Sequence, residues 1–126
     1  LSDATAIALD SDQPEAMIIP DTYHMFLAGT GPNALGRLRG DFIAIFQFAD
    51  AGKEVEPILH KGVDSQRVLP GDGKIDLKGY LSSLKKTGFD GCVSLELYNP
   101  EYRKREPVAF LKEALRKTVK VVASVG

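Results

Sequence analysis

The apolar and polar positions of this 126-residue chain divide it into alternating helices and strands. Short apolar runs bounded by Gly, Pro or Asn have the length and punctuation of strands. Strands are expected at residues 16–20, 42–48 and 92–97. Helices, where apolar residues recur at helical spacing, are expected at residues 1–12, 32–38, 77–87 and 107–122. Because strands alternate with helices, the sheet is predicted to be parallel, with right-handed crossovers.

Two of the predicted helices carry an apolar stripe that should face the core. Asp76 is placed to cap the first of them, and its stripe consists of Leu77, Tyr80, Leu81 and Leu84. Pro107 begins the second, and its stripe consists of Val108, Leu111, Leu115, Val119 and Val122. The connection at residues 50–73 shows no clear periodicity, and irregular loops of this length are usually functional.

Each predicted strand ends on a polar side chain. Asp21 follows the first strand, Gln47 lies near the end of the second, and Glu96 lies near the end of the third. Strand alternation puts Gln47 on the face of Ile43 and Ile45. Because the carboxyl ends of parallel strands meet at one edge, the three polar side chains can converge. Two carboxylates and an amide oxygen would suit a hard divalent cation. The alternatives are three unrelated polar residues at strand ends, or a Glu96 that pairs with a Lys or Arg.

Composition removes several classes of function. Lys and Arg number 16 against 17 Asp and Glu, so we expect no nucleic-acid surface. Cys92, expected to be buried, is the single cysteine and excludes an internal disulfide. No apolar run approaches the length of a membrane span, and a cytoplasmic location is the default expectation.

We expect one domain over residues 1–126, and the opening at Leu1, inside a helical pattern, suggests a fragment or a processed chain.

Four ordered motifs resemble those of the xylose-isomerase-like TIM barrels, the sugar phosphate isomerase/epimerase superfamily. Residues 21–25 resemble its D-T-x-H element, and Gln47 with Asp50 stands where that superfamily has H-x-x-D. Residues 64–73 resemble its D-x-x-R-x-x-P-G-x-G loop, and residues 88–96 resemble its G-F-x-G-x-x-S-x-E strand. The tail at residues 97–102 is most similar to the keto-inositol isomerase branch.

The resemblance implies the C-terminal portion of a (β/α)8 barrel, about three of its eight strands with their helices. Three strands cannot close a barrel, so the missing N-terminal portion or another chain should cover the open face of the sheet. We expect Ile19, Ile43 and Ile45 to point toward that barrel interior. An oligomer is also expected.

The resemblance also implies a site with one divalent metal ion. Asp21 and Glu96 would be ligands, with Gln47 where the family has a ligand His, while the family's first ligand Glu lies on a strand that this chain lacks. An amide oxygen in place of an imidazole favours Mn²⁺ or Mg²⁺ over Zn²⁺. His24 would face the substrate and Arg67 would bind its oxygens. The alternatives are a plain loop residue for His24 and an ordinary ion pair for Arg67.

These roles predict an isomerase or epimerase that moves a proton next to the carbonyl of a polyhydroxy compound through an enediolate. The proton carrier would be Glu96 or the family's first Glu, which this chain lacks. One alternative is a dehydroshikimate-dehydratase-like lyase of the same superfamily, which Gln47 favours. The other is a non-catalytic half-barrel completed by a partner chain, which the missing first Glu favours.

Overall fold

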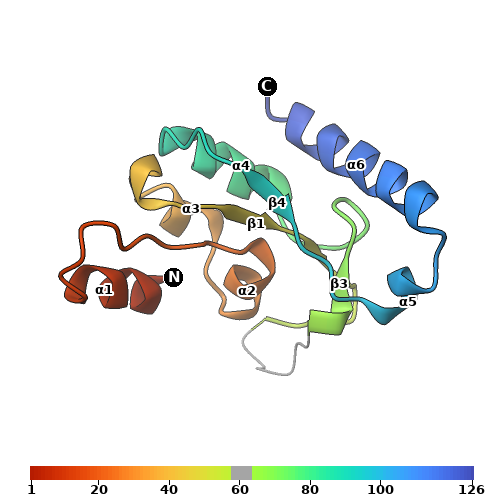
Figure 1. The fold of residues 1–126 in the computed structure, drawn as a ribbon, viewed down its shortest axis with the longest axis horizontal. Coiled ribbons are helices and arrows are strands. Elements are labelled where there is room, and N and C mark those ends of the chain that lie inside the picture. Colours follow the sequence, from red (N-terminus) through yellow and green to blue (C-terminus); the bar gives the residue numbers. More distant parts are fainter. Residues whose placement is uncertain (58–63) are drawn as a thin grey trace.

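The structure, a computed structural model, describes residues 1–57 and 64–126 (Figure 1). Its helices are α1 (Ser2–Asp10), α2 (Thr22–Leu27), α3 (Pro32–Leu35), α4 (Leu77–Lys86), α5 (Pro100–Arg103) and α6 (Pro107–Ala123). Its strands are β1 (Phe46–Phe48), β2 (Asp50–Ala51), β3 (Arg67–Val68) and β4 (Val93–Leu95), and its 3-10 turns are η1 (Gly40–Phe42) and η2 (Asp64–Gln66). His60, interpreted from the sequence as a solvated loop residue, lies outside the described residues.

The three predicted strand segments lie side by side and parallel, as expected. β1 pairs with β4, and single parallel bridges join Ile18 to Ile43 and Asp21 to Gln47 on the other edge of β1. The first segment is held by these bridges rather than by a continuous ladder, partly because Pro20 has no N–H to donate. All three segments therefore end at the same edge, where Asp21 and Gln47 are direct partners.

The described parts of residues 50–73 contain two short strands that the sequence did not predict. β2 pairs antiparallel with β3, and Arg67 lies opposite Ala51. Strands of two residues are too short to show a periodicity. This pairing brings Arg67 to the carboxyl end of β1, next to Asp21. The helix α2, which directly follows Asp21, was also not predicted.

The hydrophobic core lies between one face of the sheet and the helices α2, α3 and α4. Ile43 belongs to this core, at 3% exposed, while Ile19 and Ile45 are 52% and 38% exposed on the other face. The prediction that Ile43 shares a face with Ile45 and Gln47 is therefore wrong. Two successive exposed residues, Ala44 and Ile45, interrupt the alternation just before β1 begins.

The helix after Asp76 forms as predicted. The Asp76 carboxylate accepts a hydrogen bond from the Gly79 N–H at the start of α4, and the whole predicted stripe is buried. Tyr80 donates its hydroxyl proton to the Thr30 carbonyl, and burial raises the pKa of Tyr80 to about 12. This buried hydroxyl therefore stays protonated and joins α4 to the loop before α3.

The last helix forms where predicted, but the side of it that is buried is not the predicted one. The predicted stripe is exposed, with Leu111 at 64% and Leu115 at 66%. α6 instead packs through Ala114, which is 2% exposed, and through the partly buried Val121. The helix has apolar residues on two sides, and the sequence does not tell which side meets the described residues. In Figure 1, α6 flanks α4 at the edge of the molecule.

The second face of the sheet is open within the described residues. Met17, Ile19, Ile45 and Val93 are all more than a third exposed. Cys92 was expected to be buried but is exposed, as are the first two residues of β4, while Leu95 is partly buried. In the described part of the chain, β4 pairs with β1 on one edge. Within these residues its other edge is therefore unpaired, and nothing packs on its open face. No helix among the described residues has both the length and the apolar character of a membrane span.

Candidate active site

Asp21 is fixed by the first turn of α2. One of its oxygens, Oδ1, accepts hydrogen bonds from the N–H groups of Tyr23, at 2.7 Å, and His24, at 3.3 Å. An Asp at this position satisfies N–H groups that the helix leaves unpaired. The residue is 4% exposed. Asp21 therefore presents its second oxygen, Oδ2, in one fixed direction from the edge of the sheet.

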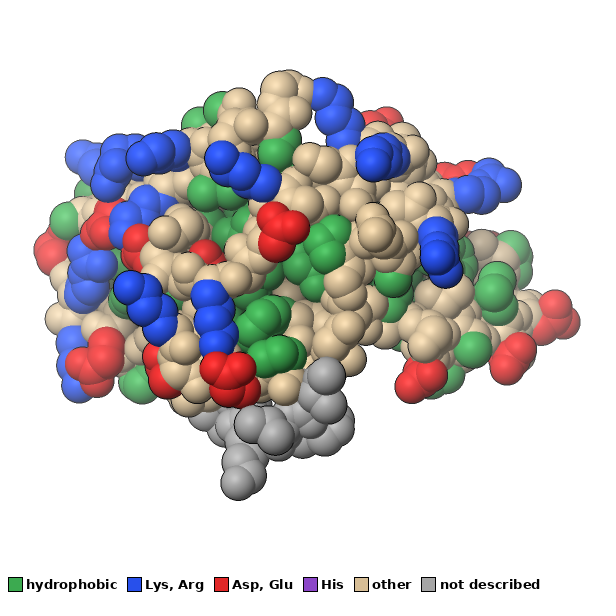
Figure 2. All heavy atoms as spheres, turned by 180° about the vertical axis from the view of Figure 1, so that it is seen from behind, with side chains coloured by type: hydrophobic (Ala, Val, Ile, Leu, Met, Phe, Trp, Pro, Cys, Tyr) green, Lys and Arg blue, Asp and Glu red, His purple; other side chains and the backbone are tan. Residues whose placement is uncertain are grey.

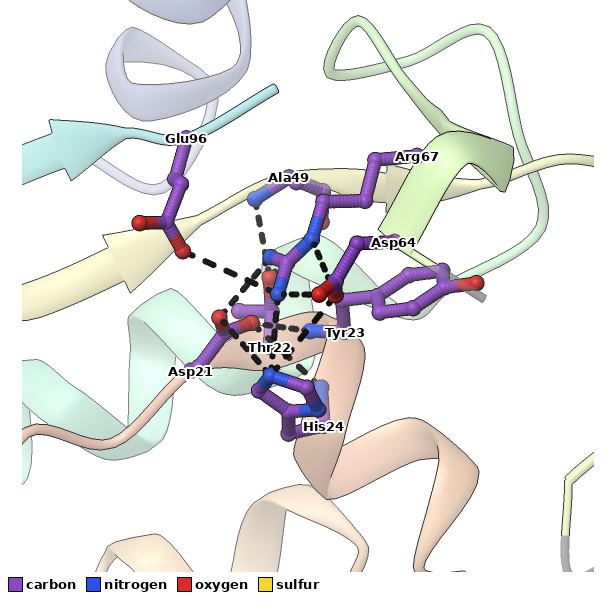
Figure 3. Close-up of polar contacts among 8 residues, drawn as sticks. All are labelled: Asp21, Thr22, Tyr23, His24, Ala49, Asp64, Arg67 and Glu96. Atoms are coloured by element: carbon purple, nitrogen blue, oxygen red, sulfur yellow. Dashed lines mark hydrogen bonds and ion pairs between the residues drawn. The ribbon is translucent and has the colours of Figure 1, made fainter. Parts of the chain in front are cut away.

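That second oxygen is bound by the buried guanidinium of Arg67 (Figure 3). Arg67 Nη1 donates to Asp21 Oδ2 at 2.8 Å. Nε and Nη2 donate to Asp64 Oδ1 at 3.2 Å and 3.0 Å, and the guanidinium lies 4.7 Å from the ring centroid of Tyr23. Burial acts to lower the pKa of Arg67, but the Asp21 and Asp64 carboxylates outweigh it and raise this pKa above its ordinary value. Arg67 is thus a permanent internal cation.

Glu96 and His24 approach the same guanidinium from different directions, Glu96 from the left and His24 from below in Figure 3. Glu96 Oε2 lies 3.7 Å from Arg67 Nη2, within ion-pair range but beyond a hydrogen bond, and its side chain is 26% exposed. His24 Nε2 lies 3.1 Å from the same nitrogen. Because a guanidinium only donates, His24 accepts through Nε2, which places the proton of the neutral ring on Nδ1. The Glu96–Arg67 pair anticipated as an alternative is present, beside Asp21.

Gln47 joins the group through its backbone and through a shared hollow. Its bridge to Asp21 sets the two residues side by side. Both line, together with His24, a hollow of about 290 Å³ whose other walls are largely apolar. The structure thus brings Asp21, His24, Arg67 and Glu96 into direct contact range, and places Gln47 at the rim of the same region.

The charges of this cluster do not cancel. Three carboxylates, those of Asp21, Asp64 and Glu96, surround one guanidinium. Two net negative charges remain, which is the charge that a divalent cation would neutralise. No set of three or more His, Cys, Asp or Glu side chains within residues 1–57 and 64–126 is arranged to hold a metal ion. The oxygen donors of Asp21, Gln47 and Glu96 suit a hard cation, and its remaining ligands would have to come from outside the described residues.

Asp50 lies in β2 beside the strand that carries Arg67, and it supports the site by anchoring the loop at residues 71–75. This role was not predicted from the sequence. Its buried carboxylate accepts four backbone hydrogen bonds, from Ala51 and Ile75 at Oδ1 and from Gly71 and Gly73 at Oδ2, all at 2.9–3.0 Å. A Cβ at Gly73 would overlap the Ala51 carbonyl oxygen. One sequence feature could have indicated this role: a P-G-x-G loop follows Asp50 along the chain. A buried carboxylate needs hydrogen-bond donors, and the backbone N–H groups of such a loop can supply them.

Replacing Asp50 with Asn should destabilise the protein by at least about 2 kcal/mol, because an amide NH2 would face N–H groups that now donate to a charged oxygen. Urea unfolding of the complete barrel measures this. The control is Asp72→Asn in the same loop, whose exposed carboxylate pairs with Lys117 and should contribute less than about 1 kcal/mol. Equal effects of the two substitutions would contradict the supporting role of Asp50.

Comparison with known proteins agrees with this architecture. The family model described as xylose isomerase-like TIM barrel matches residues 1–115. An inosose isomerase of Bacillus subtilis is 37% identical over 106 residues, 84% of this chain and 37% of that protein. A 3-dehydroshikimate dehydratase of Pseudomonas putida is 34% identical over 97 residues, 74% of this chain and 14% of that protein.

Among solved structures, a crystal structure of a protein called IolI, with a bound zinc atom, has a TM-score of 0.90 at 32% identity. The match covers 100% of this chain and 44% of that one. The chain therefore spans less than half the length of these relatives, and its three parallel segments correspond to part of a barrel.

Proposed function

Because the chain belongs to the xylose isomerase-like TIM barrel family, we propose that it supplies part of the active site of a metal-dependent isomerase or epimerase. The substrate would be a polyhydroxy carbonyl compound of the sugar or cyclitol class. Residues 1–126 would form one partial-barrel domain, and the remaining strands would cover the open face of the sheet at Met17, Ile19 and Val93.

The observation that carries this proposal is the convergence of Asp21, Arg67 and Glu96 at the carboxyl ends of the strands, where active sites of such barrels lie.

The residues of this chain that would hold the cation are Asp21, Gln47 and Glu96. When bound, a divalent cation would polarise the substrate carbonyl and make the hydrogen on the neighbouring carbon more acidic. The two uncompensated negative charges of the cluster support this assignment, since carboxylates that lie close together repel one another unless a cation lies between them.

Glu96 would move the proton. Its carboxylate is partly exposed and is held near Arg67 without a hydrogen bond to it, so its oxygens remain available to accept a proton from the substrate carbon and return it to a neighbouring one. His24, with its side chain 61% exposed at the rim, would contact the substrate hydroxyls. Arg67 fits a different role from the one expected: its nitrogens already bind Asp21 and Asp64, so it would position Asp21.

The charge of the site favours an isomerase over a dehydratase. A 3-dehydroshikimate-like substrate carries a carboxylate, which needs a positively charged partner, or equivalent donors, besides the ion that polarises the carbonyl. Within the described part of the chain, Arg67 is the one cation in contact with the cluster, and its guanidinium is occupied by Asp21, Asp64 and His24. A neutral polyhydroxy ketone needs no such partner. The dehydratase remains the second candidate because Gln47 stands in the place of the family's His.

The experiment that tests the proposal is product analysis with the complete barrel. Purified protein, stripped of metal by a chelator and reloaded with a single divalent ion, is offered inososes, ketoses and 3-dehydroshikimate. Isomerised or epimerised product that appears only after reloading supports the proposal. Dehydration alone would favour the second candidate, and a fully active metal-free protein would overturn the metal role.

The metal preference supplies a prediction of its own. The IolI structure holds zinc, whereas we propose that the amide oxygen of Gln47 favours Mn²⁺ or Mg²⁺ in this protein. Gln47→His should then shift the preference toward zinc, measured as the ratio of zinc-loaded to manganese-loaded activity and by competitive metal binding. Gln13→His, at an exposed position in the loop after α1, is the control. Equal zinc and manganese activity in the parent protein would count against the preference.

A further inference from the structure

A second hollow, of about 320 Å³, lies between α4, α6 and the loop at residues 70–72. We name it the α4–α6 cleft, and its charged lining consists of Asp72, Lys78, Arg116, Lys117 and Lys120. None of its lining residues lines the hollow beside Asp21. Figure 2, the view from behind, shows several Lys and Arg side chains along its upper left, where α6 lies. Since the whole chain has a formal net charge of −1, the cleft is a local concentration of positive charge.

One of the four cations is neutralised by the protein. Lys117 Nζ donates to Asp72 Oδ1 at 2.6 Å and lies 3.4 Å from Glu113 Oε1. The side-chain hydrogen bond to Asp72 raises the pKa of Lys117. Lys117 therefore braces the loop against α6, and both carboxylates near it are used in doing so.

The other three cations have no such partner. The side chains of Lys78, Arg116 and Lys120 make no ion pair or hydrogen bond with the described residues. Arg116 and Lys120 are one helical turn apart, an arrangement of like charges that destabilises a helix. Lys78 lies in the first turn of α4, where the helix dipole disfavours a cation. Each of these unfavourable placements is relieved if an anion lies between the three side chains.

We propose that the α4–α6 cleft binds a small phosphorylated metabolite, through its phosphate group. A phosphate dianion would accept from the Arg116 guanidinium in its planar fork and from two ammonium groups. The volume is at the lower end of that of small-molecule sites, which suits a phosphate on a small carbon skeleton rather than a nucleic acid. The loop that borders the cleft also donates the Gly71 N–H to Asp50, so the ligand would contact the element that supports the candidate active site.

The test is direct binding to the complete barrel after metal removal by a chelator, so that phosphate has no active-site cation to bind. Inorganic phosphate, pyrophosphate and glucose 6-phosphate are titrated by calorimetry at physiological salt. We expect saturable binding of at least one probe. Arg116→Gln and Lys120→Gln should each weaken it about tenfold or more, since a charge-assisted hydrogen bond is lost.

Lys104→Gln is the matched control, because Lys104 is exposed on the chain beyond α5 and pairs with Glu101 away from the cleft. It should leave binding unchanged. Binding absent up to about 10 mM, an affinity too weak for a metabolite site, would overturn the proposal. Binding that Arg116→Gln and Lys120→Gln do not weaken would overturn it as well. Because the readout is binding without metal, its outcome is independent of whether the proposed isomerase activity is found.

Discussion

Glu96→Gln should lower turnover by about 10²–10⁴-fold, the effect typical of losing a general base, while the protein keeps much of its metal. The amide retains an oxygen that can coordinate, but it cannot accept a proton at neutral pH. The structure supports this choice because Glu96 is partly exposed and lies 3.7 Å from Arg67 without a hydrogen bond. Steady-state kinetics and metal content of the complete barrel measure the two effects separately.

Glu101→Gln is the control for this substitution. Glu101 lies on α5, is exposed and pairs with Lys104, so its replacement should change neither turnover nor metal content. Turnover of Glu96→Gln at the parent rate would remove Glu96 from the chemistry. A variant that loses its metal together with turnover would restrict the role of Glu96 to that of a ligand.

Asp21→Ala should destabilise the protein by about 2–5 kcal/mol, because a charge-assisted hydrogen bond to a buried guanidinium and a helix cap are both lost, and it should also prevent metal retention. Arg67 is 1% exposed at its side chain and would remain charged and buried without its 2.8 Å partner. The first turn of α2 would lose its cap as well. Urea unfolding gives the stability change, and elemental analysis gives the metal content.

A double-mutant cycle isolates the pair. Arg67→Met removes the buried cation, so Asp21→Ala combined with Arg67→Met should be less destabilised than the sum of the two single variants. The exposed pair Arg39–Asp41 is the control cycle, with a coupling below about 1 kcal/mol. Strict additivity at Asp21 and Arg67 would contradict the positioning role. Metal binding retained in Asp21→Ala would remove Asp21 from the ligand set.

Local sequence features determined much of the framework. Asp76 caps α4 and the stripe of that helix is buried as predicted, because a helix packed on one side needs only the 3.6-residue period to show its face. The parallel alignment of the three strand segments also follows from the order of elements. The strand-end position of Asp21, Gln47 and Glu96 follows from the same order.

Tertiary structure decided what depends on distant partners. α6 packs on the side that bears Ala114, while Leu111 and Leu115 are exposed. A helix with apolar residues on two sides buries the side that its neighbours contact, and the sequence of the helix does not determine which side that is. The ion pair of Arg67 with Asp21 joins residues 46 positions apart, and no local pattern encodes that separation. A short antiparallel pairing at the end of β1 brings the guanidinium to the carboxylate. Once both are buried, the cost of an unpaired charge in a low-dielectric interior holds them together.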